Sequence, residues 1–203
     1  MQRFLTLLGK SNLKEQEFVM PYWCINAVTL KHKDKEHLAF IANAYNNGKL
    51  LSSILKDSTE ADPKLITAWR FDNWGTSKEI QRPHEDDVEP HQEKDDEEWF
   101  LDLNFETAWT PPLKLYSLLS LEGYKVQAYF WESVKGYCGR FLNNNEAFYP
   151  IEVLDSQWTS ANLPTDIDFA LGITERLEEW EEYEFELEQQ DKETSALFQE
   201  SSK

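Results

Sequence analysis

Three stretches of the chain have the hydrophobic patterns of β-strands. Apolar side chains occupy every second position over residues 99–106 and again over residues 124–131. Strands with one apolar and one polar face are typical of antiparallel sheets. Residues 23–30 are apolar on both faces, which predicts a central strand of the sheet.

Two segments near these strands have the spacing of amphipathic helices. Residues 34–46 place apolar side chains at i, i+3, i+4 and i+7, and Asp34 is the expected N-cap. Residues 110–122 are predicted to form a second helix, which begins with Thr110 as its cap and ends before Gly123.

Shorter signals complete the order of elements. Residues 72–76 are typical of a turn that leads into a short strand, and the three asparagines at residues 143–145 indicate another turn. A further strand is expected near residues 146–153. The resulting β-α-β-β-α-β order predicts an α+β fold of the ferredoxin-like class, with an antiparallel sheet and both helices on one face. We assign this domain to residues 20–155, after an N-terminal extension of residues 1–19.

A different pattern follows the predicted domain. Four apolar side chains recur near helical spacing, at Leu177, Trp180, Tyr183 and Leu187. Residues 156–193 are therefore predicted to form a linker and a long acidic amphipathic helix, packed on the domain along this stripe. The helix is expected to begin near Asp166, and residues 194–203 are expected to be a disordered tail.

Charge is distributed unevenly along the chain. The formal net charge is −18, from 20 Lys and Arg against 38 Asp and Glu. Residues 1–82 have 12 basic and 9 acidic side chains, whereas residues 83–98 have nine acids and residues 175–193 have ten. The negative field repels phosphate, which argues against nonspecific binding to a nucleic-acid backbone. Residues 83–98 also contain two prolines and are predicted to be a solvated acidic loop.

Composition and length exclude other classes of protein. With 8 Trp, 8 Tyr and 12 Phe, the chain can bury a hydrophobic core, so wholesale disorder is excluded. No stretch approaches the roughly 18 apolar residues of a membrane helix, and the apolar patch near Phe4 is too short for a signal-peptide core. Cys24 and Cys138 are too few for a disulfide framework and are interpreted as buried, reduced thiols. We therefore expect a protein of the cytoplasm.

Four short strings, spread over about two thirds of the chain, resemble the motifs of one family. They are Met-Pro-Tyr-Trp-Cys-Ile-Asn at residues 20–26, Trp69 with Asn-Trp-Gly-Thr at residues 73–76, Phe-Glu-Thr-Ala-Trp-Thr-Pro-Pro at residues 105–112, and Trp131-Glu132 with Tyr-Cys-Gly at residues 137–139. In kind and in order they resemble the YubB-type ferredoxin-like domain family of plasmid and bacteriophage proteins. The resemblance implies the ferredoxin-like fold and a mobile-element origin in a bacterial host, and it implies no reaction.

The motifs of the common enzyme classes are missing from the sequence. The chain has no dinucleotide-binding fingerprint, no P-loop, no nucleophile elbow and no kinase string. His84 and His91, with the carboxylates around them, could hold a metal ion, but a solvated acidic loop explains them better. We therefore expect no enzyme activity, no cofactor and no metal site.

The density of acids in the second acidic segment suggests a binding function. Ten acids over 19 helical residues amount to about one charge per 3 Å of axis, more than half the linear charge density of duplex DNA. Like charges one turn apart cost helix stability, so a helix that tolerates them is expected to use their field, although a merely solvated surface is an equal alternative. The predicted partner-binding residues are Glu85, Asp86, Asp87, Asp95, Asp96, Glu97, Glu98, Glu178, Glu179, Glu181, Glu182, Glu184 and Glu188.

Three functions remain open from the sequence. The first is a non-enzymatic phage or plasmid protein that binds a basic surface of a host or element-encoded protein. It would act like a DNA mimic, as an anti-defence or anti-restriction inhibitor. The second is a single-stranded nucleic-acid-binding module that uses aromatic residues such as Trp23, Trp74 and Trp109, with the acidic tail as an autoinhibitory competitor. The third is a metal-dependent enzyme that uses the carboxylates of the acidic loop.

Overall fold

A five-stranded antiparallel sheet with the strand order β2-β1-β3-β4-β5 forms the centre of the computed structural model. The structure describes residues 22–55, 65–94, 96–142 and 144–200, so the N-terminal extension of residues 1–19 lies outside the described residues. The strands are β1 (Trp23–His32), β2 (Trp99–Ala108), β3 (Lys125–Glu132), β4 (Tyr137–Leu142) and β5 (Asn145–Pro150). The helices are α1 (Lys35–Asn46), α2 (Leu50–Ile54), α3 (Ile66–Trp74), α4 (Leu113–Leu121), α5 (Ser156–Asn162), α6 (Thr165–Leu171) and α7 (Ile173–Glu200).

The strand β1 lies between β2 and β3, as its apolar faces predicted. Val28 is opposite Leu103 of β2 on one side and opposite Ala128 of β3 on the other. Because both neighbours run antiparallel to β1, β2 and β3 are parallel to each other, and α4 connects them as a split β-α-β unit. The predicted fold class, an α+β fold with a ferredoxin-like sheet, is confirmed.

The second strand of the predicted order is reduced to two isolated bridges along the outer edge of β2. Gln81 pairs with Glu106, and His91 pairs with Phe100. The residues between these bridges leave the edge and form the first half of the acidic loop. On the other side of the sheet, the hairpin of β4 and β5 adds two strands to the ferredoxin-like arrangement.

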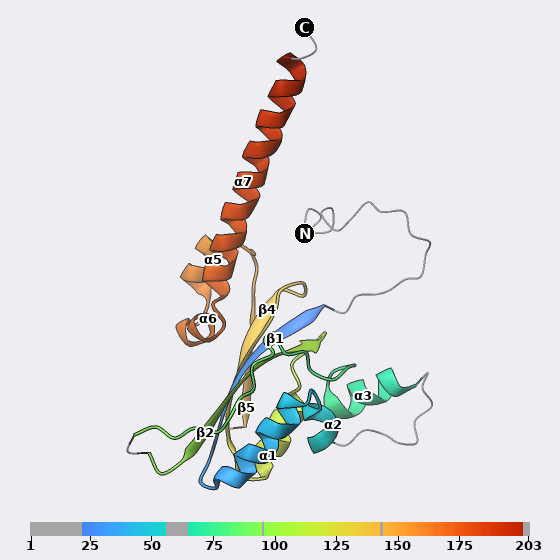
Figure 1. Ribbon diagram of the computed structural model, residues 1–203, viewed down its shortest axis with the longest axis vertical. Coiled ribbons are helices and arrows are strands. Elements are labelled where there is room, and N and C mark those ends of the chain that lie inside the picture. The colour runs from blue at the N-terminus through green and yellow to red at the C-terminus, as the bar shows by residue number, and fades with distance from the viewer. Residues whose placement is uncertain (1–21, 56–64, 95, 143, 201–203) are drawn as a thin grey trace.

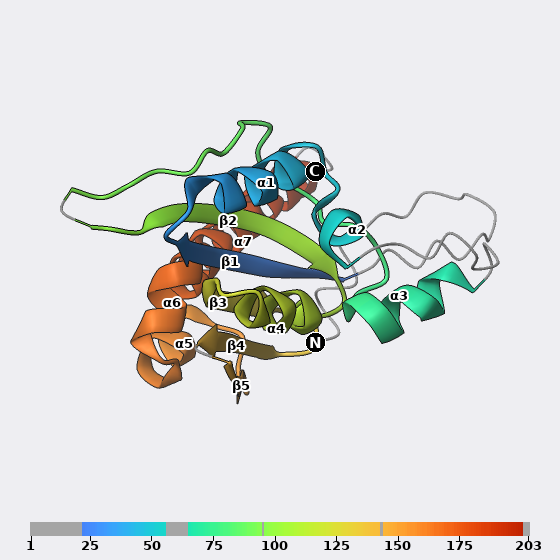
Figure 2. The same ribbon diagram turned by 90° about the horizontal axis from the view of Figure 1, so that it is seen from below.

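One face of the sheet is covered by α1 and α4, as predicted. The carboxylate of Asp34 accepts the backbone N–H of Glu36 at 2.9 Å and so caps α1. Figure 2 shows α1 lying along β2 and α4 along β3. The buried side chains of this layer include Leu38, Leu103 and Phe130. Complete burial of such a side chain contributes roughly 1.5–3 kcal/mol to the free energy of folding.

The opposite face of the sheet is also covered, which the sequence analysis did not predict. In Figure 1 the helices α1 to α3 lie on one side of the sheet, and α5 and α6 lie on the other. Here Tyr129 and Trp131 of β3 pack with Ile167 and Leu171 of α6 and with Leu177 of α7. This second layer explains why β3 is apolar on both faces near its end.

Two boundaries differ from the sequence-based prediction. Residues 72–74 end α3 instead of forming a turn, and Gly75 terminates that helix in the left-handed conformation at φ 80°. Thr110 was expected to cap the helix over residues 110–122, but its hydroxyl donates to the carbonyl of Gly75. The helix α4 therefore begins only at Leu113.

The strand β4 was not predicted, because glycine interrupts its pattern. A side-chain Cβ at Gly139 would lie only 2.4 Å from the ring of Phe130 in β3 and 2.4 Å from the carbonyl oxygen of Ala147 in β5. This close approach favours glycine at the position. Because glycine has no side chain, it breaks the alternation of apolar and polar residues by which a strand is recognised in a sequence. The turn predicted at the asparagines is confirmed at Asn144, which adopts the left-handed conformation at φ 62° between β4 and β5.

The C-terminal helix begins later than predicted and continues further. Gly172, at φ 58°, ends α6, and Asp168 accepts the N–H of Thr174 at 2.8 Å in the first turn of α7. From there α7 projects out of the body as one long helix (Figure 1). It extends to Glu200, into the segment of residues 194–203 for which a disordered tail was predicted, and residues 201–203 lie outside the described part. No helix in the described ranges is long and apolar enough to cross a membrane.

Candidate protein-binding site

The first half of the acidic loop is folded around one arginine. Arg82 donates to the carbonyl of Asn46 at 2.6 Å and to the carbonyls of Glu85 and Asp86 at 2.9 and 2.6 Å. Its guanidinium also lies 3.5 Å from the carboxylate of Asp87. The three predicted acids Glu85, Asp86 and Asp87 are exposed, but the guanidinium beside them offsets part of their negative field.

The second half of the loop has lysine partners of its own. The ammonium of Lys125 lies 2.6 Å from the carboxylate of Glu98, and Asp96 accepts the backbone N–H of Glu98 at 2.9 Å. A hollow of about 640 Å³ is lined by Lys33, Glu93, Lys94, Asp96, Glu97, Glu98 and Lys125. Asp95, also predicted to bind a partner, lies outside the described residues. Three lysines thus reduce the negative field of this half of the loop.

On α7 the predicted acids project into solvent, with two exceptions. Glu181 accepts hydrogen bonds from the backbone N–H and the hydroxyl of Ser156 at 2.8 and 2.6 Å, and Glu184 is partly buried. The exposed members of the predicted set are Glu178, Glu179, Glu182 and Glu188. In the sequence, no lysine or arginine stands between Arg176 and Lys192. The ammonium of Lys192 lies 3.7 Å from the carboxylate of Glu188, one turn before it. The other acids of α7 are therefore less compensated within their own segment than those of the loop.

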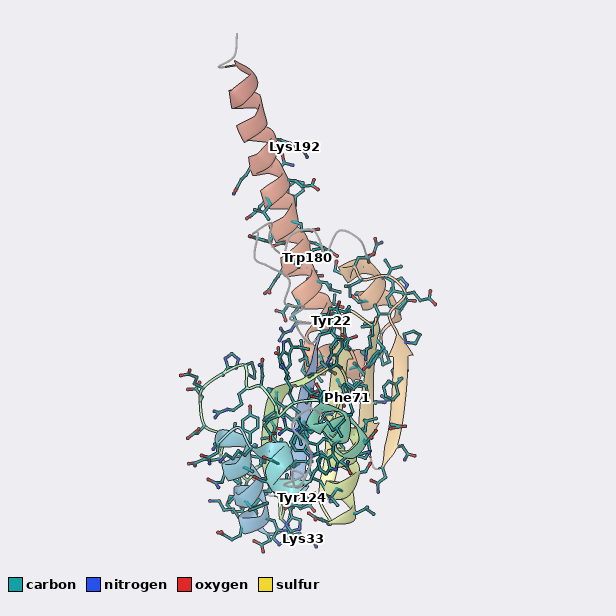
Figure 3. All side chains as sticks on the ribbon, turned by 90° about the vertical axis from the view of Figure 1, so that its right-hand side faces the viewer. Tyr22, Lys33, Phe71, Tyr124, Trp180 and Lys192 are labelled. Carbon is teal, nitrogen blue, oxygen red and sulfur yellow. The ribbon has the colours of Figure 1, made fainter. Side chains whose placement is uncertain are left out.

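The apolar stripe of α7 is fully buried only at its start, and Leu187 near its end is partly buried. Leu177 is 4% exposed and Trp180 is partly buried, but Tyr183, three residues further on, is 59% exposed. Phe185, outside the stripe, is 62% exposed. The prediction that the whole stripe packs on the domain is thus wrong at Tyr183. In Figure 3 Trp180 lies near the place where α7 leaves the body.

The two acidic segments lie toward opposite ends of the molecule. Figure 3 shows Lys33, in the wall of the loop's hollow, at one end of the long axis, and Trp180 and Lys192 toward the other. One small partner surface therefore does not contact both segments. Because its acids are exposed and carry fewer compensating cations, we take α7 as the candidate site.

Two of the family-like strings meet at one end of the sheet, where Asn26 and Thr107 form a buried polar network with Tyr116 of α4. The side-chain amide of Asn26 donates to the carbonyl of Cys24 at 2.7 Å and to the hydroxyl of Thr107 at 3.0 Å. Tyr116 donates its hydroxyl to the side-chain oxygen of Asn26 at 2.8 Å. All of these side chains are buried, so this network stabilises the fold and offers no open surface to a partner.

Glu132 belongs to the same end of the sheet and was not singled out from the sequence. Among the acidic side chains whose burial the structure describes, it alone is buried. One carboxylate oxygen accepts the backbone N–H of Lys135, and the other has no hydrogen-bond partner. Burial raises the pKa of the Glu132 carboxyl, and the contacts with Lys135 offset part of that rise. The alternation of the sequence could have indicated this burial, because Glu132 continues the inward-facing positions Val126, Ala128 and Phe130.

The two cysteines lie on opposite faces of the sheet. Cys24 of β1 is opposite Glu132 of β3, whereas Cys138 of β4 is opposite Trp131. Because neighbouring residues of a strand point to opposite faces, the two thiols cannot approach each other. Burial raises the pKa of the Cys24 thiol well above its ordinary value and that of Cys138 to about 11. Both therefore remain neutral thiols, which are poor nucleophiles.

The aromatic residues proposed for base stacking do not form an open platform. Trp74 is fully buried in the first layer, and Trp23 and Trp109 are partly buried. Helices cover both faces of the sheet at β1 and β3. The single-strand-binding alternative therefore lacks the exposed sheet on which such modules stack bases.

The structure assigns no metal-binding role to the histidines of the acidic loop. His91 lies 3.6 Å from the carboxylate of Asp102, and across the described residues no group of three or more His, Cys, Asp or Glu side chains is arranged to hold a metal ion.

No family model, no curated protein and no solved structure matches this chain. The resemblance to the YubB-type family therefore rests on the four strings alone, and the site is assigned from its geometry.

Proposed function

We propose that this protein is a non-enzymatic interaction protein that binds a basic surface of another protein through α7. The observation that carries the proposal is the exposure of Glu178, Glu179, Glu182 and Glu188 on a helix that projects out of the body. Like charges one helical turn apart destabilise a helix, and a basic partner would remove that repulsion on binding.

The chemistry of α7 suits a partner rich in lysine and arginine. Exposed acids at the rim of an interface act mainly on the association rate, by steering a basic partner toward the helix. Tyr183 and Phe185 supply apolar area among those acids, and aromatic side chains often dominate the binding energy of protein interfaces. The combination favours a fast encounter through charge, followed by anchoring through the aromatic rings.

We further propose a biological setting for this activity. The four family-like strings support an origin in a phage or plasmid, and the acidic helix suits a mimic of nucleic acid. The protein would then act in the cytoplasm of a bacterial host, as an anti-defence or anti-restriction inhibitor of a nucleic-acid-binding protein. The acids of the loop would contribute less to partner binding, because Arg82 and Lys125 already compensate the charge of some of them.

The experiment compares two variants with the same change in charge. One variant changes the helix, E178Q/E179Q/E182Q/E188Q, and the matched control changes exposed acids of the loop, E85Q/D86N/D87N/E97Q. Both leave Glu181 in place. Each immobilised protein is exposed to a bacterial lysate at about 0.01 M and about 0.15 M salt, where the Debye length is roughly 30 Å and 8 Å.

We expect the wild type and the loop variant to retain the same basic proteins at low salt, and the helix variant to lose them. The retained proteins should also be released at the higher salt concentration, because exposed charges are then screened. Retention of the same proteins by the helix variant would show that α7 is only a solvated surface. Circular dichroism checks that both variants keep their helix content.

A further inference from the structure

The arrangement of α7 also indicates what kind of basic surface it fits. This inference rests on the proposed function and names the partner class. We propose that α7 docks in protein grooves that bind single-stranded nucleic acid, because its exposed surface combines a line of acids with aromatic rings.

The acids form a ridge on the side of α7 that faces away from the body. Glu175, Glu179, Glu182 and Glu186 follow one another at spacings of four, three and four residues, and all four are exposed. At 3.6 residues per turn, these spacings place them on one side of the helix. Leu177, which is buried against the body, lies on the other side.

Aromatic side chains flank this ridge on both sides. Tyr183 directly follows Glu182, and Phe185 directly precedes Glu186, so that successive steps of about 100° turn the two rings to opposite flanks of the ridge. Both rings are more than half exposed. Trp180 lies about one turn before Tyr183 on the same flank and is partly buried where α7 leaves the body (Figure 3).

The spacing of the charges matches one strand of nucleic acid. The exposed acids from the first turn to Glu186 are Glu175, Glu178, Glu179, Glu182 and Glu186. They extend over about 16 Å of helix, or about one charge per 3–4 Å. A single strand within DNA carries one charge per about 3.4 Å of axis, and the duplex carries one per about 1.7 Å. The helix therefore falls well short of a duplex and equals a single strand.

The exposed aromatic rings favour a partner that binds single strands over a partner that binds duplexes. Grooves for single strands combine a positive channel along the backbone with aromatic side chains on which bases stack. A duplex keeps the faces of its bases inside the stack, so a duplex-binding surface offers phosphate contacts and base-edge contacts instead. The rings of Tyr183 and Phe185 could occupy stacking positions in a single-strand groove, whereas a duplex-binding surface has no such positions for them. A second copy of the chain is a poor occupant, because it would bring two acidic ridges together.

The test uses two resins, single-stranded DNA and duplex DNA, each loaded with bacterial lysate proteins and washed. The full-length protein is applied at low salt, and the released protein is measured as a fraction of what each resin holds. Three further proteins are applied in parallel: Y183S/F185S, the helix variant E178Q/E179Q/E182Q/E188Q and the loop variant of the same charge change. The aromatic variant keeps every charge of α7.

We expect the wild type and the loop variant to release proteins preferentially from the single-strand resin. Removal of the two rings should weaken this release by about tenfold or more, since stacking on aromatic rings supplies much of the affinity of such grooves. Equal release from both resins, with Y183S/F185S as active as the wild type, would leave the proposed function standing and overturn this inference. Release by the helix variant equal to that by the wild type would overturn the proposed function itself. No release from either resin, or a dimer that depends on Tyr183 and Phe185, would also overturn the inference.

Discussion

Glu181 of α7 accepts hydrogen bonds from both the backbone N–H and the hydroxyl of Ser156, at 2.8 and 2.6 Å. Ser156 is the first residue of α5, so this single acid ties the projecting helix to the body. In the sequence Glu181 is indistinguishable from its neighbours Glu179 and Glu182, which are exposed. Glu181, one acid of the predicted binding set, therefore has a structural role, and its neighbours remain available to a partner.

Replacing this acid should destabilise the protein, whereas replacing an exposed neighbour should not. Hydrogen bonds to a charged group contribute roughly 1.5–3 kcal/mol each, so E181Q, which keeps one acceptor, is expected to lower the free energy of unfolding by about 1–2 kcal/mol. E179Q relieves repulsion between like charges and is expected to raise it by about 0.2–0.5 kcal/mol. Urea unfolding followed by circular dichroism measures both values. Equal stabilities of the two variants would show that the contact with Ser156 contributes nothing.

The stripe of α7 offers a second matched pair. Leu177 is almost fully buried against the body, so L177A is expected to lower the free energy of unfolding by about 2–5 kcal/mol. Tyr183 belongs to the same stripe but is exposed, and Y183A should change stability by less than about 0.5 kcal/mol. Thermal unfolding of the two variants gives the comparison. A large loss of stability in Y183A would mean that the outer part of α7 packs on the body after all.

Glu132 predicts a specific dependence of stability on pH. Burial raises the pKa of this carboxyl above the ordinary value of 4.5, so the folded protein binds this proton more tightly than the unfolded chain does. Its contribution to stability is therefore fully present below pH 4.5 and is lost as the pH rises through the raised pKa. E132Q cannot titrate at this position, but its side-chain oxygen can still accept the N–H of Lys135.

The measurement is the free energy of unfolding of the wild type and of E132Q across this pH range. The difference between them should shift in favour of E132Q as the pH rises, because only the wild type must bury a charge. E146Q, at an exposed position on β5, serves as the control for the same change of side chain outside the core. A difference between wild type and E132Q that stays constant with pH would contradict the raised pKa.

The thiols give a prediction that needs no variant. Cys24 and Cys138 are fully buried, on opposite faces of the sheet, and burial raises the pKa of both. The folded protein should therefore react negligibly with a disulfide reagent near neutral pH, and both thiols should react after unfolding in guanidinium chloride. Mass spectrometry under oxidising conditions should show no intramolecular disulfide in the folded state. Rapid labelling of either cysteine before unfolding would place it at an accessible site.

The sequence alone was sufficient to predict β1, β2, β3 and α1. Each of them has a local pattern, of period two or of helical spacing, and the pattern depends only on which face of the element is buried. The acidic helix was also predictable, because a stripe at helical spacing and a dense run of acids are both visible within a few turns. From these elements the ferredoxin-like class followed, since their order leaves few ways to build one sheet.

Only the tertiary structure decided which acids are available and what the family-like strings do. Glu181 differs from Glu179 through Ser156, which is 25 positions away, and Asn26 finds Thr107 across 81 positions. The cover of the second sheet face likewise depends on where α5 and α6 return to the sheet. No periodicity within one segment encodes such contacts, because a periodic pattern reports only that a face is buried. The partner of that face is set by the path of the chain in three dimensions.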